Sequence, residues 1–268
     1  MITYPRKISI TGYFKEVFRF RDLLLLMSKK WIKLKYEHST IGVGWIVLSP
    51  LITTLVYTIF FGMAFDTGYT RSQYFLFIYS GMLPWVFFKD VFLDILDVFT
   101  KEPNTIKRTN FPRLIVPISS VLLKLMEFIL GLLVLFIVAF ISGKHISDHI
   151  FILPVLIVQI ILFSMGLGLI FLFPCIIYRD IKHLLRFIMP LGLYSLPVVY
   201  KVMAVPKEWL RIYTLNPMVP VIQSCRGILF KESIPWIMLG KGMSISIAVF
   251  IVGIMIFIRN EKKLADLI

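Results

Sequence analysis

The stretch "VPISSVLLKLMEFILGLLVLFIVAFI", residues 116–141, is 26 residues long and almost entirely apolar. A helix needs about 20 mostly apolar residues to cross a bilayer. Inside the bilayer every backbone N–H and C=O needs a partner, and a helix supplies these partners within one segment. We therefore predict that this stretch is a transmembrane helix.

Five further apolar stretches predict the same structure, so the fold class is an all-α polytopic membrane protein. The chain is 58% hydrophobic and 16% charged, whereas soluble domains are about half apolar and a quarter charged. The six predicted spans are residues 42–64, 74–88, 116–141, 151–177, 184–200 and 242–258.

The distribution of lysine and arginine predicts the orientation of these spans. Twenty of the 29 lysines and arginines fall in the N-terminal segment, the second loop, the fourth loop with the adjoining Arg186, and the tail, and eight fall in the other loops. Cytoplasmic loops carry the excess of positive charge, so both termini are expected in the cytoplasm. The net charge of +14 is therefore interpreted mostly as a signal of topology. Because the basic residues lie beside the spans and not on a soluble domain, nucleic-acid binding is disfavoured.

Two charged residues interrupt the stretch at 116–141. Lys124 and Glu127 are three residues apart, a spacing at which helical side chains can pair. The 14 apolar residues after Glu127 extend about 21 Å through a core about 30 Å thick, so the pair lies within about 9 Å of the cytoplasmic edge. The alternative is a proton or ion relay, which needs further deep acids.

A second charged pattern follows the second span. Asp90, Asp94 and Asp97 share one face of a helix that leaves the membrane on the cytoplasmic side. Such acids are usually solvated, although they could meet a basic partner.

The N-terminal segment, residues 1–39, is predicted to be cytoplasmic and to contain an amphipathic helix at 11–36. Its apolar residues recur at helical spacing, and basic residues occupy most of the remaining positions. Such a helix lies in the headgroup plane near anionic lipid. The six-span domain then covers 40–260, and a cytoplasmic tail covers 261–268.

The loop at 201–241 is predicted to contain a re-entrant segment. Its apolar pieces between prolines are about 10–14 residues long, too short to span. The turn is expected at Asn216, Pro217 and Met218, with Arg226 on the returning part. Irregular backbone at membrane depth must be buried in protein or line a wet cavity, so this segment indicates a pathway.

Motifs of catalysis are lacking in the sequence. No phosphate-binding loop, nucleophile elbow or H-E-x-x-H motif occurs, so we expect the chain itself to be no enzyme and to hydrolyse no nucleotide. His145 and His149 have a spacing that suits a metal, but no further ligand is near in the sequence. We expect no metal site there and interpret the histidines as part of a polar loop.

Five motifs in a fixed order resemble one family. They are "KYEHSTIGVGWIVLSPLITTLVYTIFFG", "YSGMLPWVFF", "TNFPRLIVPIS", "YRDIKHLL" and "TLNPM". Together they resemble the membrane permease subunit of polysaccharide-exporting ABC transporters, which export O-antigen, capsule or teichoic acid. The resemblance covers residues 15–260, and its specificity comes from the joint order of the motifs.

The resemblance implies a bacterial cytoplasmic (inner) membrane protein that works as a homodimer. It implies a channel between the two copies, through which a polysaccharide attached to undecaprenyl diphosphate lipid is exported. It also implies two copies of a separate ATPase subunit, which bind ATP and Mg²⁺, so no cofactor is expected on this chain.

The resemblance also assigns expected roles to residues. The loop at 97–113 is expected to dock on the ATPase. The third span is expected to begin again after this loop, at Phe111-Pro112-Arg113. The candidate docking residues are Asp97, Lys101, Glu102, Asn104, Lys107 and Arg108. Along the substrate path, basic residues are expected to attract the diphosphate and aromatic residues to contact sugars. These candidates are Lys33, Lys35, Tyr57, Phe60, Phe61, Trp85, Arg179, Tyr194 and Tyr200.

Two other functions remain open at this point. A polytopic enzyme acting on lipid-linked glycans would need clustered acids or histidines near one interface, and only Asp90, Asp94 and Asp97 come close. An ion-coupled transporter would be favoured by internal inverted repeats, and we see none in the sequence.

Overall fold

The structure is a computed structural model that describes residues 10–37, 40–42, 44–64, 68–101, 111–144 and 146–267. Every regular element in these ranges is a helix. The predicted fold class, an all-α polytopic membrane protein, is therefore confirmed. Five of the described helices are long and apolar enough to cross a bilayer.

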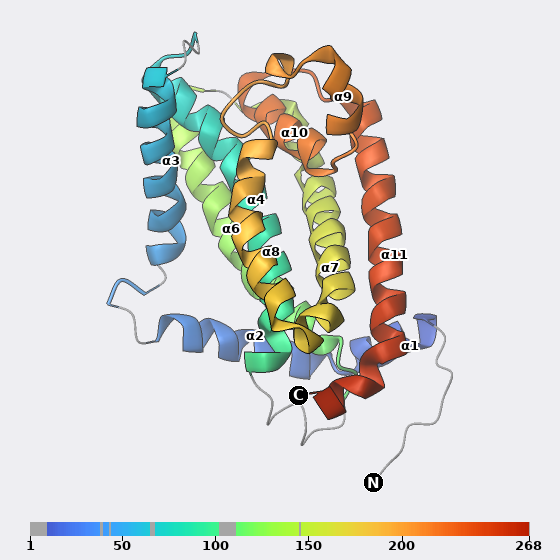
Figure 1. Cartoon of the computed structure of the whole chain (residues 1–268). Coiled ribbons are helices and arrows are strands. Elements are labelled where there is room, and N and C mark those ends of the chain that lie inside the picture. The colour runs from blue at the N-terminus through green and yellow to red at the C-terminus, as the bar shows by residue number, and fades with distance from the viewer. Residues whose placement is uncertain are drawn as a thin grey trace.

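The five long helices stand side by side in Figure 1. Three of them match predicted spans within two residues at each end: α3 (Gly44–Ala64), α6 (Ile115–Ile141) and α7 (Leu153–Ile177). α7 follows the short 3₁₀ helix η1 (Asp148–Ile152). The other two, α4 (Arg71–Lys101) and α11 (Trp236–Leu267), extend well beyond the predicted spans.

The predicted fifth span is not a continuous helix. Residues 184–200 contain the end of α8 (Arg179–Leu191), then the 3₁₀ helix η2 (Gly192–Ser195) and a turn. At 1.5 Å per residue α8 is about 20 Å long, shorter than the bilayer core. Pro190 lies in its last turn, where it removes a backbone donor. Hydropathy alone had merged α8 with the apolar turn that follows it.

Short elements gather at the end of the bundle opposite to α1, as Figure 1 shows. They are η3 (Val202–Ala204), α9 (Lys207–Tyr213) and α10 (Met218–Phe230). α10 begins where the turn was expected, and the Asn216 side chain accepts a hydrogen bond of 3.0 Å from the Met218 N–H. Eleven of its thirteen residues are buried. Its re-entrant position relative to a bilayer stays a prediction.

The N-terminal segment forms two helices where one was expected. α1 (Ile10–Arg19) and α2 (Arg21–Tyr36) lie across the other end of the bundle, which we call the terminal end because the last turns of α11 lie there too (Figure 1). Tyr13 and Val17 of α1 pack into the core of the bundle. The Ser28 hydroxyl of α2 lies 3.3 Å from the Ser119 carbonyl oxygen of α6 and donates a hydrogen bond to it. The described residues of both helices therefore pack partly on protein.

Burial differs strongly among the five long helices. In the most apolar 18 residues of each helix, 78% of α4 is buried but only 11% of α3. α4 is thus the central helix, with α6, α7, α10 and α3 packed around it. α3 presents most of its surface outward.

The tightest helix contact lies between α7 and α11. A Cβ atom on Gly253 would lie 2.5 Å from the carbonyl oxygen of Gly166, and a Cβ atom on Gly166 would lie 2.7 Å from the Phe250 Cα. Small residues at these positions let the two backbones touch, which is a common way for helices to associate in membranes.

This contact predicts opposite effects for two glycines of α11. Gly253→Ala should lower the free energy of unfolding by about 1–3 kcal/mol, because the new methyl group meets rigid backbone. Gly240→Ala is the matched control, because a Cβ atom there has nothing within 4 Å; it should raise stability by about 0.5–1 kcal/mol. Thermal unfolding of the protein in detergent measures both, and equal shifts would contradict the packing described.

Candidate functional site

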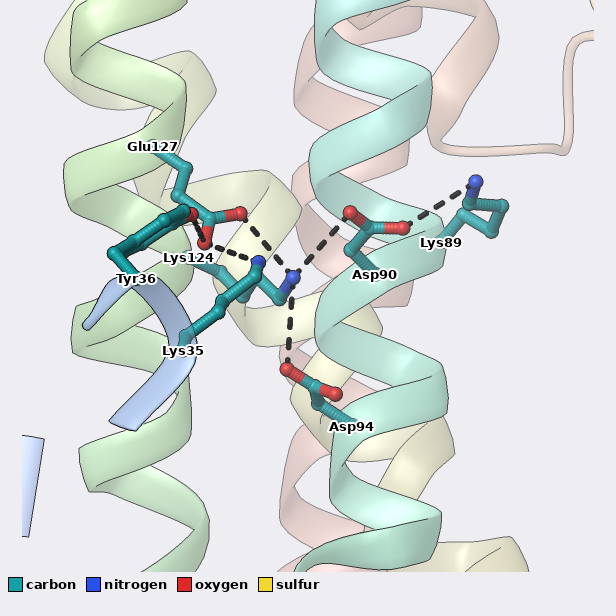
Figure 2. Close-up of polar contacts among 7 residues, drawn as sticks. All are labelled: Lys35, Tyr36, Lys89, Asp90, Asp94, Lys124 and Glu127. Atoms are coloured by element: carbon teal, nitrogen blue, oxygen red, sulfur yellow. Dashed lines mark hydrogen bonds and ion pairs between the residues drawn. The ribbon is translucent and has the colours of Figure 1, made fainter. Parts of the chain in front are cut away.

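The charged cluster centres on Lys124 of α6. Its Nζ atom lies 3.2 Å from Glu127 Oε2, 3.4 Å from Asp90 Oδ2 and 3.6 Å from Asp94 Oδ2 (Figure 2). Lys124 is only 7% exposed. The predicted Lys124–Glu127 pair is confirmed, and Lys124 is also a basic partner for Asp90 and Asp94 of α4.

Helix geometry explains this arrangement. Asp90 and Asp94 are one turn apart on α4, and Lys124 and Glu127 are one turn apart on α6, so each pair projects from one side of its helix. The two sides face each other where α4 and α6 pack together. A buried ammonium is tolerated when it is paired and hydrogen-bonded, as Lys124 is here.

The end of α2 joins the cluster through Glu127. Lys35 Nζ lies 2.5 Å from Glu127 Oε1, and the Tyr36 hydroxyl donates a hydrogen bond of 2.6 Å to the same oxygen. Burial, followed by the nearby ammonium of Lys124, lowers the pKa of Lys35. Burial and the hydrogen bond to Glu127 raise the pKa of Tyr36, so its hydroxyl stays a donor. Sequence reasoning missed this link because residues 35 and 127 are distant in the chain.

Of the cavities that adjoin the cluster, two lie on either side of the first turns of α3. The larger, about 320 Å³, lies between α2, α3, α4 and α6 and is lined by Lys35, Lys124 and Glu127 among others. The smaller, about 220 Å³, lies between α3, α4 and the end of α8. Four residues line both cavities: Ser49, Pro50, Val86 and Asp90. Charged groups therefore reach hollow space on both sides of α3.

α8 is held to α4 by Asp97. Lys182 Nζ and Arg186 Nη2 lie 2.5 Å from the two carboxylate oxygens of Asp97. No residue of α8 is buried, and Arg179 and His183 are exposed. The sequence contained a signal for this contact. Lys182 and Arg186 are four residues apart, and the acids of α4 are three or four residues apart, so each set lies on one side of its helix.

The end opposite to α1 is held by Arg226 of α10, which is 2% exposed. Its guanidinium donates hydrogen bonds to the carbonyl oxygens of Val198 (2.6 Å), Tyr200 (3.3 Å) and Phe77 (3.4 Å). It also lies 3.5 Å from the centre of the Phe77 ring, a cation–π contact. Arg226 thus joins α4, α10 and residues 198–200.

The predicted path residues lie at several places along α3, α4 and η2. Phe60 is 65% exposed, Tyr194 is 51% exposed, and Trp85 is 5% exposed and contacts Phe88. Tyr57 packs edge-on against Phe61 and, with Trp85, lines the smaller cavity.

Two other path residues already have partners within the chain. The Tyr200 hydroxyl hydrogen-bonds to the Tyr213 hydroxyl (3.2 Å) and donates to the Tyr194 carbonyl oxygen (3.3 Å). Lys33 is exposed and pairs with Glu37 at 3.4 Å.

Most predicted docking residues cannot be placed. Glu102, Asn104, Lys107 and Arg108 lie outside the described residues, as does His145, and Lys101 is described only as the last residue of α4. Asp97 is described, and its carboxylate is already paired with α8. Phe111 is buried and α6 begins at Ile115, which agrees with the expected restart of the third span.

Removal of the central ammonium should destabilise the protein. Lys124→Met leaves Asp90, Asp94 and Glu127 close together without the one ammonium that contacts all three, and loss of one partner of a buried charge group costs about 3–5 kcal/mol. Lys33→Met is the control, because Lys33 is in an exposed pair worth at most about 1 kcal/mol. Thermal unfolding in detergent compares the two, and similar shifts would contradict the central role of Lys124.

Comparison with known proteins gives one family. The profile of the family described as "ABC-2 type transporter" matches residues 22–230. The chain is also similar to proteins named "O-antigen export system permease protein RfbA". One relative from Klebsiella pneumoniae is 25% identical over 248 residues, which are 92% of this chain and 95% of the relative. The relative from Myxococcus xanthus is 25% identical over 223 residues, 82% of this chain and 85% of the relative.

The family match runs from α2 to the end of α10 and includes the charged cluster, α8 and Arg226. Because the match covers well over half of the residues, the chain belongs to the ABC-2 type transporter family.

Proposed function

We propose that this chain is the membrane subunit of an ATP-driven exporter of lipid-linked polysaccharide, such as O-antigen on undecaprenyl diphosphate. The observation that carries the proposal is similarity along almost the whole chain to a permease named for O-antigen export, covering 92% of this chain and 95% of the relative. The multi-pass helical structure suits such a subunit.

The chain lies in the bacterial inner membrane with its terminal end in the cytoplasm. The excess of lysine and arginine in the segments at that end supports this orientation. In this orientation α1 and α2 lie along the cytoplasmic face, and the charged cluster lies at the level of the inner leaflet.

Two copies of the chain form the export channel. α3 is largely exposed, and α8 has no buried residue although one side carries Arg179 and His183, both exposed. Charged side chains facing lipid are expensive, so such residues normally face protein or a water-filled path. A second copy against these helices, with a wet channel between, satisfies both the exposed apolar surface and the charges.

The energy for export comes from a separate ATPase that docks on the loop at 97–113. Asp97 lies at the start of this region and is ion-paired with Lys182 and Arg186 of α8. Movement of the docked loop therefore reaches α8 through charge-assisted contacts. The ATPase can shift the channel between two states only through contacts that differ between them.

The substrate meets basic groups first and aromatic groups later. The exposed Lys33 and Arg179 suit attraction of the diphosphate, whereas Lys35 is already engaged by Glu127. The exposed rings of Phe60 and Tyr194 can contact sugars weakly. Weak, repeated contacts let a polymer keep sliding.

A polytopic enzyme is less well supported by these contacts. Asp90 and Asp94 are engaged by Lys124, and Asp97 by Lys182 and Arg186. No observation favours an ion-coupled transporter over an ATP-driven one.

Purification and reconstitution test the proposal. From native membranes the chain should co-purify with an ATPase at one to one. In vesicles, undecaprenyl-diphosphate-linked polysaccharide should cross the membrane only when both chains and ATP are present. If the chain by itself moves or modifies the glycolipid without ATP, the proposed function is wrong.

Thiol labelling tests the water-filled path. Phe187 on α8 is 70% exposed, and a cysteine there should react rapidly with a charged, membrane-impermeant methanethiosulfonate in the assembled complex. Val252→Cys on α11 is the control, because Val252 is 43% exposed on a spanning helix and is expected to face lipid. The native Cys175 and Cys225 are buried. Equally slow labelling of both sites would place α8 against lipid and contradict the channel.

A further inference from the structure

Three distant segments of the chain meet at the carboxylate of Glu261 in α11. The Tyr13 hydroxyl of α1 donates a hydrogen bond of 2.6 Å to Glu261 Oε1, and the backbone N–H of Arg113 donates one of 2.8 Å to the same oxygen. The Arg113 side chain also donates through Nη1 to the Glu261 carbonyl oxygen at 3.4 Å. One side chain therefore joins α1, the start of α6 and the last turns of α11.

The surroundings of this contact favour a well-defined geometry. Tyr13 is 3% exposed, and the residues on both sides of Arg113, Pro112 and Leu114, are buried. Burial and the neighbouring carboxylate raise the pKa of Tyr13, so its hydroxyl keeps the proton and remains a donor. Hydrogen bonds to a carboxylate are among the stronger ones, particularly where water is scarce.

The position of Arg113 in the chain gives the contact its significance. Arg113 follows the loop expected to dock on the ATPase, and α4 precedes that loop. On the α4 side, Asp97 holds α8 through Lys182 and Arg186. On the α6 side, Glu261 holds α11 and α1. The two flanks of the loop are thus attached to different helices.

Both attachments lead to the same helix. α11 touches α7 along its length, with direct backbone contact at Gly166 and Gly253. α7 ends at Ile177, and α8 begins two residues later at Arg179. A displacement at Glu261 can therefore reach α8 through α11 and α7, while a displacement at Asp97 reaches α8 directly. Packed helices carry such displacements because their cores are dense.

We propose that Glu261 is a positioning residue for export, which links the segment that ends at Arg113 to α11 and α1 so that movement driven by the ATPase reaches the channel. The inference rests on the proposed function. Glu261 is not a substrate contact, and its effect is on the amount of glycan exported for each ATP hydrolysed.

The experiment uses the whole complex with its ATPase, reconstituted in proteoliposomes. The probe is undecaprenyl diphosphate carrying the host's own O-polysaccharide, and ATP hydrolysis and export are measured in the same vesicles. Glu261→Ala should lower the ratio of glycan exported to ATP hydrolysed by at least about fivefold, the lower range of typical coupling between sites. Assembly with the ATPase and hydrolysis itself should persist.

Milder variants separate positioning from folding. Glu261→Gln keeps an oxygen that accepts both hydrogen bonds and should stay near the wild-type ratio. Tyr13→Phe removes one donor and keeps the ring, so the ratio should fall less than in Glu261→Ala. The double variant Tyr13→Phe/Glu261→Ala should match Glu261→Ala, because both changes act on one contact. Arg259→Ala is the matched control, since Arg259 is exposed two residues away on α11.

The outcomes are distinguishable from failure of the proposed function. If the wild-type complex does not export with ATP, the proposed function fails. If it exports and Glu261→Ala or Tyr13→Phe keeps the wild-type ratio, only the role of Glu261 is overturned. An equal loss in Arg259→Ala, or in Glu261→Gln compared with Glu261→Ala, overturns it as well.

Discussion

The need to neutralise a lysine inside an apolar bundle organises the centre of this protein. Lys124 is almost fully buried, and a charge out of water must be paired. Its carboxylate partners come from two helices, α4 and α6, and Glu127 in turn binds the end of α2. The requirement is met by two spanning helices that face each other, and Glu127 also attaches the end of α2 to them.

The same principle recurs at other levels of the bundle. Asp97 holds α8 to α4, Arg226 holds α10 and residues 198–200 to α4, and Glu261 joins α1 and α6 to α11. Lipid tails are as apolar as the side chains of the helices, so helix association depends on close packing and polar contacts. Such contacts also suit a transporter, because a charged contact moves as a unit and can exist in discrete arrangements.

Two helices of the bundle are left largely uncovered by the rest of the described chain. α3 is the least buried of the long helices, and α8 exposes charges beside apolar residues. α3 also separates two cavities that share residues of its second turn, beside the charged cluster. The region around the start of α3 thus combines few protein contacts with hollow, charged space.

Sequence reasoning succeeded where the physics is local. Residues 44–64, 115–141 and 153–177 are helices because only a helix satisfies the backbone of a long apolar segment in lipid. The Lys124–Glu127 pair followed from helical spacing on one element. The fifth span was misjudged because an apolar turn after Pro190 has the same hydropathy as a helix. The single helix expected at 11–36 is interrupted at Phe20, next to Arg21, where the apolar pattern of the helix is also broken.

By itself the sequence determined the fold class, most spanning helices and the resemblance to polysaccharide permeases. The tertiary structure alone decided which charges meet: Lys35 with Glu127, Lys182 and Arg186 with Asp97, and Tyr13 and Arg113 with Glu261. The physical reason is the distance along the chain over which each effect acts. Hydropathy and helical period act between neighbours in the chain, whereas pairing of buried charges depends on which helix sides face each other, and only the packing of the whole bundle decides that.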